Sequence, residues 1–332
     1  MKTHYIITLI LMTFISSCKK KLEVSNCSID HPYKFTSEIQ KKLEADSTIW
    51  KHEPAAWDYS RIGDYKNALA QWEKSREALY NSFGYIDKDS INPEVVLNNY
   101  AFVDAKSFIL NEARNYQVLI INEAHHHPRD RAFTAGLLPE LKKLGYHSIG
   151  YEAAADSIST LNDYPNRGLG FYTEEPQFGE LIRTALQLGF NQFAYDDDGD
   201  LQGDDREKYQ AEKISEHLIK NPDSKIIVHC GFGHLKEDEY SRTMGYYLKT
   251  LYDIDPLTIS QTRYTEQNSK KTEQEIYRDI DISQPSILVD KNNQVFNKGQ
   301  TTAPEIDIQV FHPRTTWLSG RPDWLEYNGK DY

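Results

Sequence analysis

Residues 116–153 read YQVLIINEAHHHPRDRAFTAGLLPELKKLGYHSIGYEA. The apolar run Val118–Ile121 is short and rich in β-branched residues, which is typical of a strand buried on both faces. A helical pattern of apolar residues follows, and it ends at Gly145, where a residue free to adopt positive φ is favoured. A second short strand, Ser148–Tyr151, leads into Glu152. This strand–helix–strand unit predicts an α/β fold.

The same rhythm continues towards the C-terminus, with helical patterns alternating with short apolar runs. The expected helices cover 176–188, 204–220 and 239–251, and the expected strands cover 191–195, 225–230, 256–260, 286–289 and 306–311. Such alternation predicts a three-layer α/β domain, a mostly parallel sheet with helices on both faces. We expect the polar stretch 262–285 to be an insertion or a mobile loop, and the tail to pack on the domain.

The N-terminal part has a different character. A tetratricopeptide-like pattern near Gly63 has no second copy, so we expect a helical pair in 55–84, and we expect helix again in 93–115. The chain is therefore divided into a signal peptide (1–17), a tether (18–36), a helical segment (37–115) and an α/β domain with a C-terminal extension (116–332).

Composition limits the function classes. The chain has 332 residues, 39% of them hydrophobic, which is enough for a large core. Its net charge is −12, which argues against binding nucleic acid or an anionic membrane face. The oligomeric state is left open.

The first residues predict export. A basic start precedes an apolar run over 6–15, which is too short to span a bilayer comfortably, and small residues then precede Cys18. This pattern resembles a bacterial lipoprotein signal, although Ile15 stands where Leu is usual. The resemblance implies cleavage before Cys18, a lipid anchor on its sulfur, and a location in the bacterial cell envelope outside the cytoplasm. We expect Cys230 to be a buried free thiol rather than a partner of Cys27.

Acids and imidazoles gather at the predicted strand ends. Glu123 and His125 or His126 follow the first strand, Glu152 follows the second, and His234 follows the strand that ends in Gly-Phe-Gly. Because the carboxyl ends of parallel strands share one edge, we expect these side chains to converge there. Which of His125 and His126 faces the site depends on how sharply the chain turns after Glu123.

Two kinds of chemistry fit this set. Carboxylates and neutral imidazoles such as Glu123, His125, Glu152 and His234 can hold a divalent metal. Alternatively, one histidine acts as a general base oriented by a carboxylate. Arg206, near a helix N-terminus on the same edge, is a candidate to stabilise an oxyanion.

Three neighbouring residues have simpler expected roles. We expect Asp196 to lie near the site, His127 to be on the surface and His229 to be a hydrogen-bonded core histidine.

The motifs resemble those of the erythromycin-esterase/ChaN/Tiki-like superfamily. The resemblance rests on Asn122-Glu123-Ala124-His125-His126, on Arg206-Glu207 and on Gly231-Phe232-Gly233-His234, within 116–235. The family has Gly where this chain has Asn122. His125 matches the ChaN-like spacing and His126 the esterase-like spacing.

The resemblance implies three functions. Esterase-like members are hydrolases with a histidine base, Tiki-like members are metal-dependent proteases, and ChaN-like members are lipoproteins that resemble haem-binding uptake proteins. We therefore expect a hydrolase of an ester or amide, acting on a small-molecule or peptide substrate. The alternatives are a haem- or metal-binding uptake lipoprotein and an inactive relative that acts as an interaction protein.

Overall fold

The computed structural model describes residues 34–84, 91–165, 168–197, 199–296 and 305–328, and residues 34–332 form one compact unit. The predicted signal peptide, Cys18 and Cys27 lie outside the described residues. No helix within the described ranges has the length and apolar character needed to cross a membrane.

A six-stranded parallel sheet forms the centre of the fold, in the order β4-β3-β5-β2-β6-β8. Its strands are β2 (Val118–Glu123), β3 (Tyr146–Tyr151), β4 (Asn191–Ala194), β5 (Lys225–Gly231), β6 (Leu257–Ser260) and β8 (Ile308–Gln309). Strand β2 is buried along its whole length, because strands flank it on both sides and helices cover both faces.

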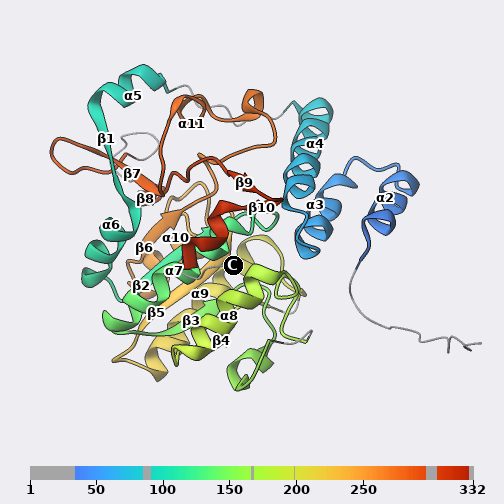
Figure 1. Ribbon diagram of the computed structural model, residues 1–332. Helices are drawn as coiled ribbons and strands as arrows, with labels where there is room; N and C mark the ends of the chain where they lie inside the picture. Colours follow the sequence, from blue (N-terminus) through green and yellow to red (C-terminus); the bar gives the residue numbers. More distant parts are fainter. Residues whose placement is uncertain (1–33, 85–90, 166–167, 198, 297–304, 329–332) are drawn as a thin grey trace, which may run out of the picture. The chain divides into compact units, whose positions relative to one another are not determined.

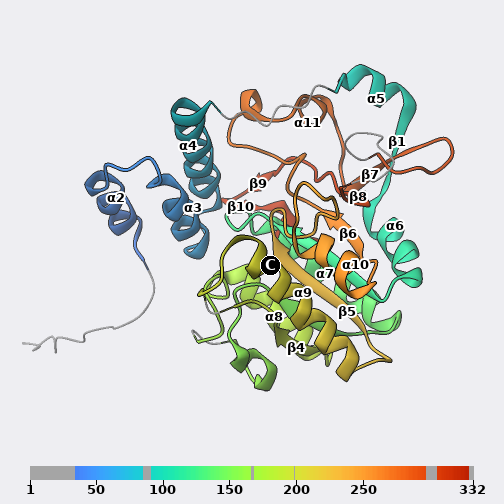
Figure 2. The same ribbon diagram turned by 180° about the vertical axis from the view of Figure 1, so that it is seen from behind.

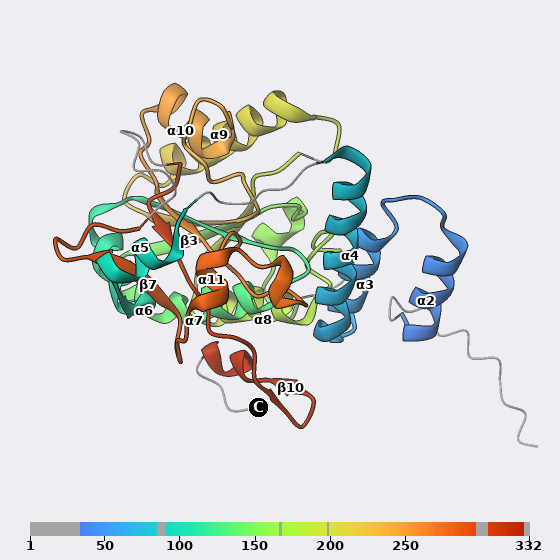
Figure 3. The ribbon, with the colours of Figure 1, turned by 90° about the horizontal axis from the view of Figure 1, so that it is seen from above.

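Successive residues of β2 serve opposite sides of the sheet. Leu119 and Ile121 belong to a core formed with α6 (Ala105–Glu112), α7 (Arg129–Lys143) and α8 (Pro176–Gln187). Val118 and Ile120 belong to a core formed with α9 (Gly203–Lys220) and α10 (Met244–Tyr252). Figure 2 shows α9 and α10 over one face, and Figure 3 shows the layers edge-on. The predicted three-layer α/β class is confirmed.

The N-terminal helices are α2 (Thr36–Ala45), α3 (His52–Arg61) and α4 (Tyr65–Phe83) (Figure 1). Helices α3 and α4 form the predicted helical pair. Gly63, at φ 77°, makes the turn between them, and the Asp64 carboxylate accepts a hydrogen bond from the backbone N–H of Asn67 to cap α4. The length of α4 matters for the site, because its Trp72 reaches the loop after β2.

The prediction of helix throughout 93–115 is wrong. Helix α5 (Pro93–Asn99) gives way to strand β1 (Tyr100–Asp104), which pairs antiparallel with β7 (Ser286–Asp290) before α6 begins. Residues 100–103 are Tyr-Ala-Phe-Val, which suit a strand, but the partner that selects this conformation lies far along the chain.

Two further expectations are corrected in the C-terminal half. Helix α10 begins at Met244 rather than Glu239, because turns occupy the residues before it. The polar stretch 262–285 contains α11 (Glu275–Asp279), and its Tyr264 and Tyr277 are buried against Phe311, so apolar anchors fix this segment to the domain.

The last described elements are β9 (Trp317–Leu318), β10 (Arg321–Pro322) and the 3₁₀ turn η4 (Asp323–Asn328). This tail packs back on the domain through Trp324, whose ring lies 5.1 Å from that of Tyr65.

Candidate functional site

The candidate site lies where three adjacent strands end. Glu123 ends β2 and pairs in register with Gly231 at the end of β5, while Glu152 follows β3 on the other side of β5. Both carboxylates are almost fully buried. The predicted convergence of Glu123, His125, Glu152 and His234 at one sheet edge is therefore present, and it forms two linked clusters.

Glu123 is the centre of the first cluster. Its carboxylate receives hydrogen bonds from Nδ1 of His125 at 2.8 Å, from Nε2 of His229 at 2.9 Å, and from Nε and Nη2 of Arg131. Burial opposes ionisation, but Arg131 and the two imidazoles outweigh it and hold the pKa of Glu123 well below its usual range. Glu123 is therefore a carboxylate that accepts hydrogen bonds, not a proton shuttle.

His125 is held in one orientation by this carboxylate. Because an ionised carboxylate only accepts, Nδ1 carries a proton, so in the neutral ring Nε2 is the nitrogen that has the lone pair. Within the described part of the chain, Nε2 has no hydrogen-bond partner. The ring stacks on Tyr172 at 3.8 Å and meets Phe232 edge-on at 5.1 Å. The imidazole therefore presents an unpaired basic nitrogen from a fixed ring.

Gly231 leaves room for that nitrogen. A Cβ at this position would lie 2.5 Å from Nε2 of His125 and 3.0 Å from Oε2 of Glu152. The missing side chain thus brings the basic nitrogen of the first cluster close to the carboxylate of the second.

Glu152 forms the second cluster. It receives hydrogen bonds from Nη2 of Arg206 at 2.9 Å and from the backbone N–H of Gly231, and it lies 3.3 Å from Nε2 of His234. Burial again raises its pKa, but His234 and Arg206 lower it by more, so Glu152 is ionised.

His234 carries a positive charge at neutral pH. Its Nδ1 lies 2.7 Å from Oε1 of Glu207 while Nε2 faces Glu152. Burial disfavours the charged ring, but the two carboxylates raise its pKa to about 10. His234 is therefore an acid rather than a base in this site.

Arg206 joins the second cluster to the next strand. Its Nε and Nη2 donate to Asp196 at 3.0 and 2.5 Å, and its Nη1 lies 3.5 Å from Nε2 of His234. Asp196 also accepts from the backbone N–H of Ala153. Sequence reasoning placed both Arg206 and Asp196 near this edge, and the structure brings them there.

His126 and His127 point away from the two carboxylates. His126 stacks on Trp72 at 4.1 Å, and His127 is buried with no partner for either ring nitrogen in the described residues. Burial lowers the pKa of both rings well below the usual range. The expectation that His127 lies on the surface is wrong, because the turn that returns its N–H to Ala124 folds the ring inward.

Four residues contribute to the site although the sequence did not assign them to it: Arg131, Glu175, Tyr172 and His229. Arg131 also donates to Glu175 at 2.8 Å, Tyr172 stacks on His125, and His229, expected only as a core histidine, holds Glu123. The position of His229 on β5, opposite Ile121, was the available signal, since the neighbouring strand end carries Glu123.

The side chains present do not fit a divalent metal. Both oxygens of Glu123 are bound by Arg131, and Glu152 is paired with Arg206 and cationic His234, so the expected ligand set is already neutralised by fixed positive charges. Among the described residues, no group of three or more His, Cys, Asp and Glu side chains is arranged to hold a metal.

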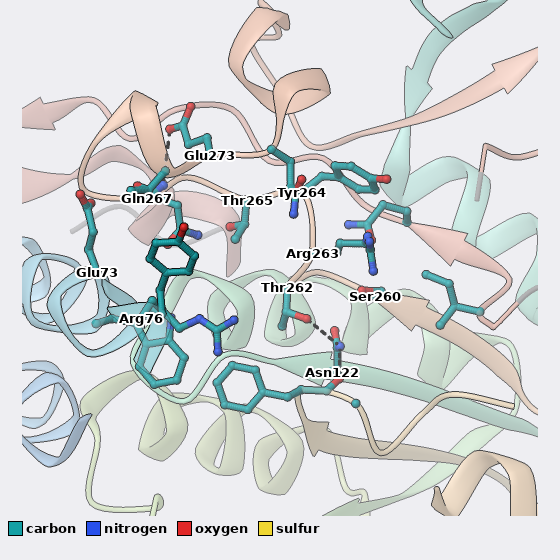
Figure 4. A pocket seen from close by; sticks show the side chains of 18 of the residues that line it. Glu73, Arg76, Asn122, Ser260, Thr262, Arg263, Tyr264, Thr265, Gln267 and Glu273 are labelled. Atoms are coloured by element: carbon teal, nitrogen blue, oxygen red, sulfur yellow. Dashed lines mark hydrogen bonds between the residues drawn. The ribbon is translucent and has the colours of Figure 1, made fainter. Parts of the chain in front are cut away.

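A cavity of about 860 Å³ adjoins the first cluster. It does not include His125 or Glu123; Phe232 and Trp72, which stack on each other at 5.4 Å, form part of its wall. Figure 4 shows the cavity from close by, with Asn122 and Thr262 joined by a hydrogen bond at its floor.

No protein-family model and no curated protein matches this chain. Solved structures that are similar to it come from bacterial effectors and toxins. The type III effector HopBA1 has 12% identity and a TM-score of 0.39, over 67% of this chain and 99% of that chain. A structure described as bacterial protein toxins has 16% identity and a TM-score of 0.32, over 60% and 45%. RRSP, a MARTX toxin effector domain from Vibrio vulnificus CMCP6, has 16% identity and a TM-score of 0.30, over 68% and 45%.

Proposed function

We propose that the α/β domain hydrolyses an ester or amide, with Nε2 of His125 as the general base. The observation that carries this proposal is the 2.8 Å hydrogen bond from Nδ1 of His125 to Glu123, which leaves Nε2 unpaired beside Gly231. A buried carboxylate that accepts from Nδ1 fixes the tautomer and the ring orientation of the imidazole, as a general base requires.

The proposed reaction uses water and needs no other reactant. Nε2 of His125 takes a proton from water as the water oxygen attacks the carbonyl carbon, and the carbonyl oxygen becomes an oxyanion. Arg206 and the cationic ring of His234 stabilise that negative charge. The intermediate then expels the alcohol or amine, which takes the proton from His125.

A second candidate function has its own supporting observation. Both carboxylates are salt-bridged, Glu123 to Arg131 and Glu152 to Arg206, as expected for an inactive relative that acts as an interaction protein. Screening the purified protein on chromogenic esters and amides separates the two. Turnover above that of the heat-unfolded protein supports the hydrolase, and its absence across the panel supports the interaction protein.

We propose further that the protein is a lipoprotein of the bacterial cell envelope, anchored to the membrane through Cys18, and that it is a distant member of the erythromycin-esterase/ChaN/Tiki-like superfamily. The support for the anchor is the apolar run and the small residues before Cys18. Detergent phase partitioning of the wild type and Cys18→Ser tests it, since only the acylated protein is expected in the detergent phase.

A further inference from the structure

The cavity beside the first cluster is built from elements that are far apart in the sequence. Helix α4 forms one wall, the ends of β2, β5, β6 and β8 form the floor, and residues 262–274 close the opposite side. Its volume of about 860 Å³ lies within the roughly 300–1,000 Å³ of small-molecule sites.

Aromatic rings line the helical wall. Trp72 and Phe232 stack with an interplanar angle of 12°, and Tyr80, about two turns beyond Trp72 on α4, is 43% exposed. The exposed Tyr80 ring offers a flat apolar face to a ligand. A ligand for this cavity therefore needs an apolar face of its own.

The floor and the opposite side offer hydrogen-bond donors. The Thr262 hydroxyl accepts from Asn122 at 3.1 Å, and the Thr265 hydroxyl accepts from Arg129 at 2.5 Å. Each hydroxyl still has its own proton, and no hydrogen bond from either is found among the described residues. Because each hydroxyl oxygen already accepts a hydrogen bond, its proton is available to be donated to a ligand.

Acceptors line the same cavity. Gln309 is buried, and its Oε1 has no partner in the described part of the chain, nor has Oε2 of Glu73. An unpaired buried acceptor costs free energy unless a ligand satisfies it. A ligand that satisfies the cavity lining therefore carries hydrogen-bond donors as well as acceptors.

The charges around the cavity nearly cancel. Four basic residues line it, Arg76, Lys236, Arg263 and Lys271, beside five acidic residues, Glu53, Glu73, Glu77, Glu273 and Glu305. Two of the acids are paired, Glu305 with Lys236 at 3.4 Å and Glu273 with Arg314 at 2.6 Å. A balanced lining favours a neutral ligand over a polyanion or a polycation.

We propose that this cavity binds a short neutral oligosaccharide. Each sugar hydroxyl both donates and accepts, and the C–H face of a pyranose ring packs on aromatic rings, so one ligand class meets all three requirements. An extended peptide fits less well, because β2, β5 and β6 are each paired on both sides, and the edge strand β8 has only two residues to offer for strand addition.

This site lies beside the proposed catalytic base. Phe232 lines the cavity, and the centre of its ring lies 5.1 Å from that of His125. The proposal goes beyond hydrolysis, and binding is measured without turnover, so failure of one does not decide the other.

Isothermal titration of the whole protein with cellotetraose, chitotetraose and maltotetraose tests the proposal, with a mixed-composition hexapeptide as the comparison ligand. We expect at least one saccharide to bind with a Kd of about 1 mM or tighter. Tyr80→Ala is expected to weaken that binding by about 3- to 10-fold. Phe83→Ala is the matched control, since Phe83 is an exposed aromatic residue on the same helix, outside the cavity lining.

Repeating the titration with His125→Ala separates binding from catalysis, and saccharide binding is expected to survive in that variant. Thr262→Val, which removes only a hydroxyl donor, is expected to weaken binding as well. The proposal is overturned if no saccharide binds, if only the hexapeptide binds, or if Tyr80→Ala and Thr262→Val both bind like the wild type.

Discussion

Nδ1 of His125 lies 2.8 Å from Oε1 of Glu123, and the same carboxylate is held by Arg131 and His229. The carboxylate is therefore fixed before any substrate arrives, and it fixes the imidazole in turn. Of the three consecutive histidines at 125–127, His125 therefore has a tautomer that Glu123 defines, and its Nε2 is left unpaired.

Glu123→Ala is expected to destabilise the fold. It leaves the buried guanidinium of Arg131 with Glu175 as its remaining carboxylate partner, and breaking a buried ion pair costs about 3–5 kcal/mol. Urea unfolding monitored by circular dichroism measures the free energy of unfolding. Glu140→Ala is the control, because Glu140 pairs with Lys143 on the exposed side of α7 and its loss should leave the midpoint unchanged. Equal urea midpoints for both variants would show that Glu123 does not stabilise the fold.

Gly231→Ala is expected to remove hydrolysis while the protein stays folded. The added methyl group would occupy the space of Nε2 of His125 and press on Glu152. Gly233→Ala is the matched control, since a Cβ there meets only the flexible end of Lys236 at 4.0 Å. We expect kcat/KM to fall by at least about 100-fold in the first variant, the lower limit for loss of a general base, and to change little in the second. Similar losses in both would place the base elsewhere.

His234 is expected to stay protonated through neutral pH. Its pKa in the folded protein is raised from 6.5 to about 10, so its stabilising contribution is fully present below pH 6.5 and is lost as the pH rises through about 10. Histidine NMR titration of the wild type and His234→Gln identifies its resonance. A midpoint between pH 6 and 7 would contradict the ion pairs with Glu152 and Glu207.

Removal of metals is expected to leave hydrolysis unchanged. The carboxylates that a metal would need are paired with Arg131 and Arg206. Activity is compared before and after dialysis against EDTA, and again after zinc is added back. Activity that is lost with the chelator and restored by zinc would contradict this arrangement.

The sequence predicts the sheet and the strand-end residues well, because both depend on local patterns. Val118–Ile121 is apolar without interruption, Glu123 ends β2, Glu152 directly follows β3, and His234 lies three residues beyond β5. Contacts between distant segments are not visible in such patterns. The pairing of β1 with β7 overrides the helical pattern of 93–115, and the packing of Trp72 against His126 selects His125 as the ring that meets Glu123.

The cavity could not be predicted for the same reason. Its wall comes from α4 and its opposite side from residues 262–274, which the sequence suggests belong to an insertion or a mobile loop. Tyr264 is buried and stacks on Phe311, and this contact fixes the segment in place. A single tyrosine in a polar stretch does not predict burial, because its partner Phe311 lies far along the chain.

The most direct measurement compares kcat/KM for ester hydrolysis in His125→Ala and His126→Ala. The two residues are adjacent and both are buried, but only His125 contacts Glu123. We predict that His125→Ala lowers kcat/KM by about 10²- to 10⁴-fold and that His126→Ala stays within about tenfold of the wild type. The reverse order, or equal activity in the two variants and the wild type, would contradict the assignment of His125 as the base.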